Sequence, residues 1–163
     1  MSVVLALGTN QGDLISNLKK AISRINLISS VVEVSRIYES EPFGPIPQPN
    51  FYNLVLESTT PKTTPTEYMN SLLEIELQMG RIRNQKWGPR IIDIDILFWE
   101  DQTINSSFLT IPHPLIQQRS FVLLPLSEIT FYNKIKNKYP VPNDSKFLTH
   151  SWPLEVSDGF FAR

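Results

Sequence analysis

Two aspartates stand two positions apart in an otherwise apolar run, IIDIDILF at residues 91–98. Because successive strand side chains point to opposite faces, a strand here places Asp93 and Asp95 on one face and the isoleucines beside them on the other. Burying either carboxylate without a partner is costly, so the acidic face must be open to solvent or hold cations. The pair by itself fits two interpretations about equally: a metal-binding strand, or a half-solvated strand with acidic residues on its wet side.

Basic residues gather just before this strand, and they favour the first interpretation. They are Arg81, Arg83, Lys86 and Arg90. Mg²⁺ is usually bound by one or two carboxylates together with phosphate oxygens and water, so carboxylates beside arginines suit a cation and a phosphate held at one place. The chain has neither the GxxxxGK[ST] phosphate loop nor the glycine loop of protein kinases. The pattern therefore predicts a phosphoryl-transfer site of another architecture.

Aromatic and amide side chains form a second group that could hold a ligand. They are Phe43, Phe51, Asn53 and Phe121. Aromatic rings with an amide between them can sandwich a flat heterocycle and hydrogen-bond its edge. The alternative is that the phenylalanines are core residues, which is their commonest role. The proline-rich segment at residues 40–49 is either a stiff connector, which we favour, or a polyproline ligand for a partner.

Length and composition bound the class of protein. The 163 residues, 41% hydrophobic and 19% charged, are typical of one globular domain, 1–163. A net charge of −1 gives no overall electrostatic signal for nucleic acid or an anionic membrane, and we expect neither as a partner. The absence of cysteine excludes thiol chemistry and disulfides. No signal peptide precedes the first apolar run, so we expect a cytoplasmic protein.

Hydrophobic periodicity orders the elements that must position these side chains. The expected elements are a strand at 3–7 closed by a turn at Gly8, a helix from Asp13, strands at 31–38 and 51–58, a helix from Thr64 to Gly80, and the acidic strand. Thr64 and Glu67 form a capping box with Pro65 at the first helical position. The order β-α-β-β-α-β predicts an α+β, ferredoxin-like fold. Its helices would cover one face of the sheet, and the aspartates would look out from the other.

The rest of the chain has weaker patterns. Residues 119–128 are compatible with a helix interrupted near Pro125. We therefore expect a core at about 3–129, additional C-terminal helix and strand elements, and a tail at 130–163 to which no role is assigned.

Six short motifs carry a resemblance to a known family. They are LGTN at 7–10, EPFGP at 41–45, FYN at 51–53, GRIR at 80–83, WGPRIIDID at 87–95, and IPHP at 111–114 followed by Arg119 and Phe121. In order and spacing they resemble the 6-hydroxymethyl-7,8-dihydropterin pyrophosphokinases of folate biosynthesis. The resemblance implies a Mg-dependent transferase that moves the diphosphate of ATP to the pterin hydroxymethyl oxygen and releases AMP. It also implies two Mg²⁺ ions, with ATP and the pterin as the only small-molecule partners.

The same resemblance implies roles for individual residues. Asp93 and Asp95 would bind the metal ions, and Arg83, Arg90 and Asp95 would be catalytic. The ATP site would comprise Glu76, Arg83, Lys86, Trp87, Arg90, Ile96, Thr110, His113 and Arg119. The pterin site would comprise Ser40, Phe43, Phe51, Asn53, Trp87, Asp95 and Phe121. Asp95 is the candidate that activates the substrate hydroxyl.

Two other functions share the expected fold. RNA-recognition domains have the same element order, but they need an aromatic, basic sheet face where this chain carries two aspartates. A regulatory domain that binds a small ligand without turnover is the second alternative, and the absence of ATP turnover would favour it. We expect a monomer, with a dimer left open.

Overall fold

The computed structural model describes residues 1–42, 44–82, 88–142 and 148–155. Its strands are β1 (Ser2–Thr9), β2 (Val31–Val34), β3 (Ile37–Ser40), β4 (Phe51–Thr59), β5 (Asp93–Trp99), β6 (Ile104–Asn105), β7 (Thr110–Ile111) and β8 (Leu148–Trp152). Its α-helices are α1 (Leu14–Ile28), α2 (Pro65–Gln78) and α3 (Ser120–Glu128), and two short 3₁₀ helices, η1 (Ile116–Gln118) and η2 (Thr130–Lys134), flank α3. None of these helices is long and apolar enough to cross a membrane.

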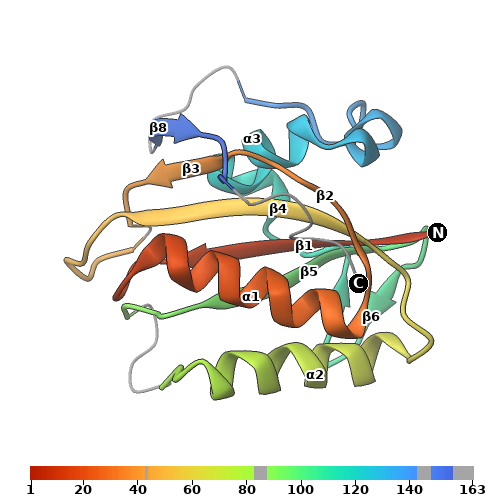
Figure 1. The fold of residues 1–163 in the computed structure, drawn as a ribbon. Coiled ribbons are helices and arrows are strands. Elements are labelled where there is room, and N and C mark those ends of the chain that lie inside the picture. Colours follow the sequence, from red (N-terminus) through yellow and green to blue (C-terminus); the bar gives the residue numbers. More distant parts are fainter. Residues whose placement is uncertain (43, 83–87, 143–147, 156–163) are drawn as a thin grey trace.

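One antiparallel sheet organises the chain. Its strands follow the order β5-β1-β4-β3-β8, with β2 also paired to β4. Helices α1 and α2 lie on one face of this sheet and α3 on the other (Figure 1). The ferredoxin-like fold class is confirmed, but three strands lie between α1 and α2 where two were predicted. A separate two-stranded sheet joins β6 to β7.

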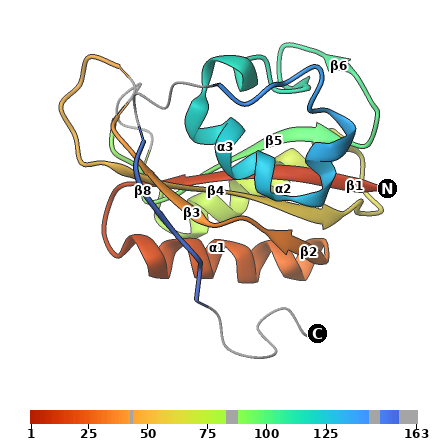
Figure 2. The ribbon, with the colours of Figure 1, turned by 90° about the horizontal axis from the view of Figure 1, so that it is seen from above.

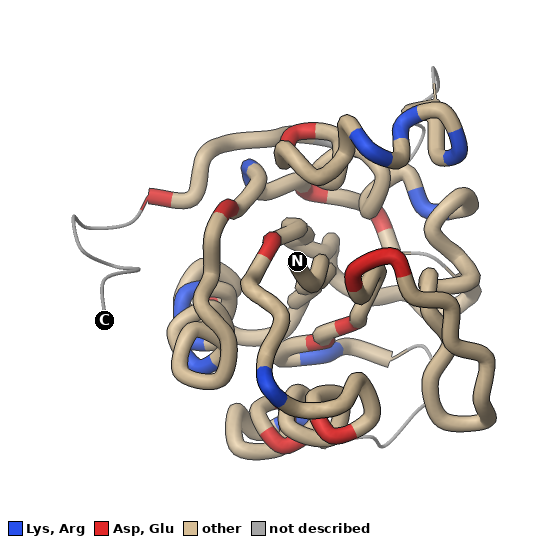
Figure 3. Tube along the Cα trace, turned by 90° about the vertical axis from the view of Figure 1, so that its right-hand side faces the viewer, with Lys and Arg blue, Asp and Glu red and all other residues tan. Residues whose placement is uncertain are grey.

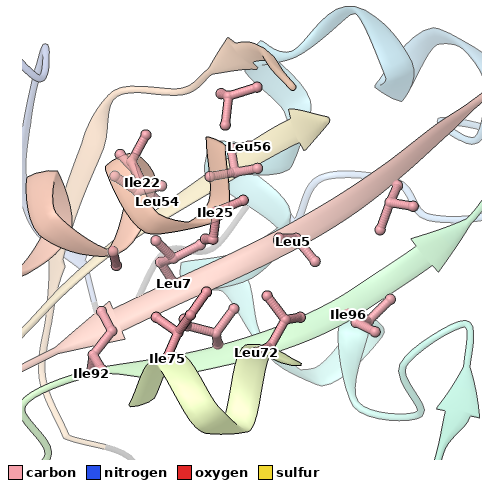
Figure 4. Packing of buried hydrophobic residues seen from close by; sticks show 14 of the residues in the cluster. Leu5, Leu7, Ile22, Ile25, Leu54, Leu56, Leu72, Ile75, Ile92 and Ile96 are labelled. Carbon is pink, nitrogen blue, oxygen red and sulfur yellow. The ribbon is translucent and has the colours of Figure 1, made fainter. Parts of the chain in front are cut away.

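The core between the sheet and the first two helices forms as the sequence predicts. Asp13 caps α1 by accepting a hydrogen bond from Ser16 N–H, and the Thr64–Glu67 capping box starts α2. Leu72 and Ile75 of α2 point at the isoleucines of β5 (Figure 4). All three isoleucines of β5 and its approach, Ile92, Ile94 and Ile96, are buried in this cluster. The prediction that they face the helices is confirmed.

The opposite face of the sheet differs from the prediction. It was expected to stay available along its length, but α3 and η2 cover one half of it with a second apolar cluster, which includes Val4, Val55, Leu97, Phe98, Leu123 and Phe131. A β-bulge on β5 makes this possible, because Val4 pairs with Phe98 and Leu5 with Ile96. Leu97 is the extra residue, so it and Phe98 both join the second cluster.

Three local predictions are wrong. Gly8 is not in a turn but inside β1, where it pairs with Asn53 and Asp93. The expected strand at 31–38 is broken into β2 and β3, because the Arg36 N–H turns away to donate to Glu128 of α3. Helix α3 runs through Pro125 without interruption, and the proline is buried.

The tail contributes a strand to the sheet. Strand β8 runs antiparallel to β3 at the edge of the sheet (Figure 2). The Trp152 ring meets Tyr52 of β4 edge-on, with 4.8 Å between ring centroids. Acidic and basic residues are both spread along the described part of the trace (Figure 3), in keeping with the net charge of −1.

Candidate active site

A cavity opens on the half of the sheet that α3 leaves uncovered. It is lined by Ala6, Leu7, Gly8, Ser40, Glu41, Gln48, Phe51, Asn53, Leu54, Arg90, Asp93, Asp95, Arg119, Phe121 and Val122. The cavity lining therefore includes the two aspartates assigned to metal, two of the arginines assigned to ATP, and four further residues assigned to the pterin. These residues come from positions 40 to 121, so only the fold brings them together.

Arginines hold Asp93 at this cavity. Its Oδ1 accepts a hydrogen bond from Arg81 Nη1 at 2.6 Å, and its Oδ2 accepts one from Arg90 Nη1. The same Arg81 nitrogen lies 2.5 Å from Glu76 Oε2. Asp93 therefore belongs to a charge network although 25% of its side-chain surface is exposed. Sequence reasoning counted Arg81 among the phosphate-binding cations, whereas the structure pairs it with two carboxylates.

Asp95 lies in a different electrostatic environment from Asp93. Its Oδ2 is 3.6 Å from Arg119 Nη1 and 3.8 Å from His113 Nε2. Loss of hydration raises the pKa of Asp95 to about 7, and the charge of Asp93 adds to this effect against the lowering effect of Arg119. The metal-free site thus has one carboxylate neutralised by arginine and another that binds a proton easily.

His113 faces Asp95 as a neutral ring. Burial, together with the charge of Arg119, lowers the pKa of His113 to about 4. Its Nδ1 accepts a hydrogen bond from the Leu115 N–H at 3.2 Å. The ring proton is therefore on Nε2, which faces Asp95 Oδ2 across 3.8 Å.

The donor set fits Mg²⁺. Among the described residues, no group of three or more histidine, cysteine or carboxylate side chains could form a complete cage for a metal ion. Asp93 and Asp95 supply two hard oxygen ligands from one strand face, and Mg²⁺ needs no more than this when phosphate oxygens and water fill its other positions.

A second part of the cavity wall has the chemistry of a heterocycle site. Asn53 Nδ2 donates to Ser40 Oγ at 2.8 Å and to the Tyr38 carbonyl at 3.2 Å, which fixes the amide plane. A Cβ on Gly8 would lie 3.3 Å from Asn53 Oδ1, so the glycine makes room for that oxygen. The Phe51 and Phe121 rings complete this wall, and the Arg119 guanidinium carbon lies 5.8 Å from the centre of the Phe121 ring.

Other predicted ATP residues lie outside the lining of the cavity. Glu76 is 2% exposed and accepts a hydrogen bond from Ile94 N–H at 2.7 Å. Ile96 is 2% exposed, with its side chain in the core on the helix face. Thr110 belongs to β7, beside β5. Phe43, Arg83, Lys86 and Trp87 lie outside the described residues.

Sequence reasoning assigned no role to three residues that shape the site. Gly8 was taken for a turn, Gln48 for part of a connector, and Asn10 appeared only inside a motif. A glycine inside a buried strand pattern is itself a signal of close approach by another group, and this signal could have identified Gly8. A single amide after a strand gives no such signal for Asn10.

Comparison with known proteins assigns the family. The model of the 7,8-dihydro-6-hydroxymethylpterin-pyrophosphokinase (HPPK) family matches residues 4–131. The chain belongs to the HPPK family. The Aquifex aeolicus pyrophosphokinase is 41% identical over 128 residues, which are 78% of this chain and 79% of that protein. The Synechocystis pyrophosphokinase is 43% identical over 129 residues, which are 77% of this chain and 65% of that protein. The Bacillus subtilis pyrophosphokinase is 39% identical over 127 residues, which are 77% of this chain and 75% of that protein.

Solved HPPK structures share the fold. An HPPK-DHPS chain from Plasmodium falciparum superposes with a TM-score of 0.68 at 18% identity, covering 90% of this chain and 48% of the Plasmodium chain. A second structure, of the wild-type Plasmodium falciparum HPPK-DHPS with pterin and p-hydroxybenzoate, has a TM-score of 0.61 at 18% identity. The match covers 85% of this chain and 43% of the Plasmodium chain. This HPPK-family chain thus spans less than half of each of those proteins.

Proposed function

We propose that this HPPK-family chain transfers the diphosphate of ATP to 6-hydroxymethyl-7,8-dihydropterin, giving AMP and the pterin diphosphate, in folate biosynthesis. One observation carries the proposal. A single cavity is lined both by carboxylates with guanidinium groups and by an amide with aromatic rings. Phosphoryl transfer to an alcohol on a flat heterocycle needs both sets of groups, placed so that the two substrates meet.

The pterin binds against the aromatic wall. Its ring lies between Phe51 and Phe121, and Asn53 Oδ1 accepts a hydrogen bond from an N–H on its edge. Asn53 is held by Ser40 and the Tyr38 carbonyl, so little orientation entropy remains to be lost on binding. The hydroxymethyl group then points toward Asp95.

The phosphates bind against the charged wall. Asp93 and Asp95 would hold two Mg²⁺ ions, the number that the family resemblance implies. The bound metal would neutralise charge on the phosphate oxygens. Arg90 and Arg119 line the same cavity and neutralise the charge that moves to the bridging oxygen as AMP leaves. Arg83, Lys86 and Trp87 are proposed to complete the nucleotide site, together with Thr110 and His113.

The chemical step is a substitution at phosphorus. The hydroxymethyl oxygen forms a bond to the β-phosphorus of ATP, and the bond from that phosphorus to the α,β-bridging oxygen breaks. The bridging oxygen leaves with AMP, and the hydroxyl proton passes to Asp95 Oδ2. His113 Nε2 and Arg119 Nη1 lie within 4 Å of this oxygen, and the charge of Arg119 favours the carboxylate form of Asp95, which is the form that accepts the proton.

Identification of the nucleotide product tests the proposal. The protein is incubated with Mg²⁺, ATP and the hydroxymethyl dihydropterin, and the products are separated by chromatography and identified by ³¹P NMR. AMP and a pterin diphosphate in equal amounts are expected, and neither should form with Asp95→Asn. ADP with a monophosphorylated pterin would contradict the assignment, and binding of both substrates without AMP formation would favour a regulatory ligand-binding domain.

A further inference from the structure

Strand β8 lies beyond the part of the chain that the HPPK family model matches, which ends at residue 131. It nevertheless joins the main sheet and pairs with every residue of β3, from Ile37 opposite Trp152 to Ser40 opposite Leu148 (Figure 2). The register shifts by one residue after Glu39, so β8 has one residue more than β3 over this stretch. Strand β8 therefore begins beside Ser40, which lines the cavity.

Strand β3 supports the heterocycle part of the cavity. The Asn53 amide nitrogen donates to the Tyr38 carbonyl and to Ser40 Oγ, and both of these acceptors belong to β3. The strand has only four residues, and its neighbours in the sheet are β4 and β8. Without β8 it would be a short edge strand, paired on one side only. The position of the two acceptors therefore depends on a segment outside the family match.

Trp152 of β8 reinforces this pairing from the helix side of the sheet. Its ring meets the Tyr52 ring edge-on, at 4.8 Å between centroids and an interplanar angle of 80°. Tyr52 stands between Phe51 and Asn53 on β4, and both Tyr52 and Trp152 pack against the cluster beneath α1 and α2. Aromatic pairs in this geometry contribute more than their buried area alone. Trp152 thus holds, from behind, the stretch of β4 that presents Phe51 and Asn53 to the cavity.

Polar contacts of β8 are weaker. Arg36 Nη2 donates to the Ser151 carbonyl at 3.1 Å. His150 Nδ1 lies 3.5 Å from Glu39 Oε2, but the His150 side chain is 75% exposed, and exposed ion pairs contribute little. The support that β8 gives to β3 and β4 therefore comes mainly from its backbone pairing and from Trp152.

We infer that β8 is a positioning element of the pterin site and that Trp152 is its anchor. The strand holds β3 and β4 so that the Asn53 amide and the Phe51 ring keep the orientation that the heterocycle needs. When the anchor is lost, β3 and β4 have more freedom here, and the pterin must restore their order on binding, which weakens its affinity. The inference rests on the proposed function for the identity of this ligand.

The nucleotide side of the cavity should not depend on β8 in the same way. Arg90, Asp93 and Asp95 belong to β5 and the approach to it, and β5 lies at the opposite end of the strand order from β8. Strands β1 and β4 separate the two ends. Loss of the anchor should therefore weaken binding of the pterin and leave binding of the nucleotide almost unchanged.

Trp152→Ala tests the inference, with Met69→Ala as the matched control. Both side chains are partly buried and pack against the same apolar cluster. Met69 belongs to α2, none of whose described residues lines the cavity. Both variants thus lose apolar contact in one cluster, but only the first loses it behind the pterin site. Trp152→Phe keeps a ring at this position and is the rescue variant.

Isothermal titration calorimetry measures the Kd of 6-hydroxymethylpterin with saturating Mg²⁺ and the α,β-methylene analogue of ATP, and separately the Kd of that analogue with Mg²⁺. In Trp152→Ala the pterin Kd should rise about tenfold, because an aromatic contact and the order that it imposes are lost. The nucleotide Kd of this variant, and both constants of Met69→Ala and Trp152→Phe, should stay within about threefold of the wild type. Steady-state AMP formation should show a raised KM for the pterin and an unchanged KM for ATP.

Trp152→Leu covers the case in which Trp152→Ala does not fold. Leucine keeps apolar burial and loses the ring contact with Tyr52, so the pterin Kd should rise about fivefold. Pterin constants that stay at the wild-type value in the alanine and leucine variants, or that rise equally in Met69→Ala, would overturn the role of β8 and leave the proposed function intact. Failure of the wild type to bind either ligand would instead overturn the proposed function, and the inference with it.

Discussion

The two halves of one sheet face have opposite character. Near the start of β5, Asp93 and Asp95 look into an open, charged cavity. Near its end, on the same face, Leu97 and Phe98 are buried under α3 and η2, and the Phe98 ring packs against Phe131 at 5.2 Å between centroids. One strand therefore carries both a solvated reaction site and an apolar cluster, separated by a single bulge.

This difference shows how the fold holds a site that cannot stabilise itself. Like charges and a cavity contribute no hydrophobic burial, so the energy that fixes β5 must come from elsewhere. The covered half supplies it on the same face, and the α1–α2 core supplies it from behind. Activity should thus be sensitive to changes in the open half, and stability to changes in the covered half.

The largest effect is expected at Asp95. Asp95→Ala should lower kcat/KM by at least about a thousandfold, because metal and arginine clamps contribute several kcal/mol to transition-state stabilisation. The measurement is steady-state AMP formation. A loss below about tenfold would mean that the open half is not the reaction site.

In the covered half, Phe98→Ala should lower the free energy of unfolding by about 3 kcal/mol, since it leaves a cavity between two aromatic rings. Urea unfolding followed by circular dichroism measures this change. The protein that remains folded at low temperature should keep pterin affinity within about threefold. A much larger loss of affinity would show that the two halves are not separable.

The two aspartates should differ in their effect on stability. Asp93→Ala leaves Arg81 and Arg90 without their carboxylate and should cost about 2 kcal/mol of unfolding free energy in the metal-free protein. Asp95→Ala should leave stability unchanged or slightly raised, because it removes a poorly hydrated anion beside Asp93. Equal destabilisation by both substitutions would contradict the asymmetric network described above.

Gly8→Ala tests the close approach of β1 to the heterocycle wall. The new Cβ would sit 3.3 Å from Asn53 Oδ1, so the amide must shift from its bonds to Ser40 and Tyr38. Pterin affinity should fall about tenfold, because the new methyl group modestly overpacks the Asn53 amide. Nucleotide affinity should stay within about threefold of the wild-type value. An unchanged pterin dissociation constant would show that Asn53 is not a recognition group.

The smallest effect concerns the bond that ties α3 to the sheet. Burial, and then the hydrogen bond to Glu128 and the charge of that carboxylate, raise the pKa of Tyr38 to about 12. Since the unfolded value is about 10, the contribution of Tyr38 to stability is fully present below pH 10 and is lost as pH rises through about 12. When the pH is raised from 9 to 11, the urea midpoint of unfolding should fall less for Tyr38→Phe than for the wild type. Equal falls would mean that the phenol is not held by Glu128.

Local chemistry made most of the fold predictable. The caps of α1 and α2 depend on residues within four positions of one another, and the alternation of β5 requires only that the strand be extended. The bulge at Leu97, the break between β2 and β3, and the uninterrupted α3 depend on partners far along the chain. Propensity and periodicity carry no information about such partners, so these three features could not be predicted.

The sequence by itself determined that Asp93 and Asp95 share one face and that the isoleucines of β5 are buried, because strand geometry leaves no alternative. It also determined the family, through motifs whose order survives in the linear chain. Only the tertiary structure decided which cation meets which anion and which segments the Asn10 amide joins. Arg81 pairs with Glu76 and Asp93, and Asn10 bonds to Gln48 and Arg90, because the sheet brings the end of β1 between the proline-rich loop and the approach to β5.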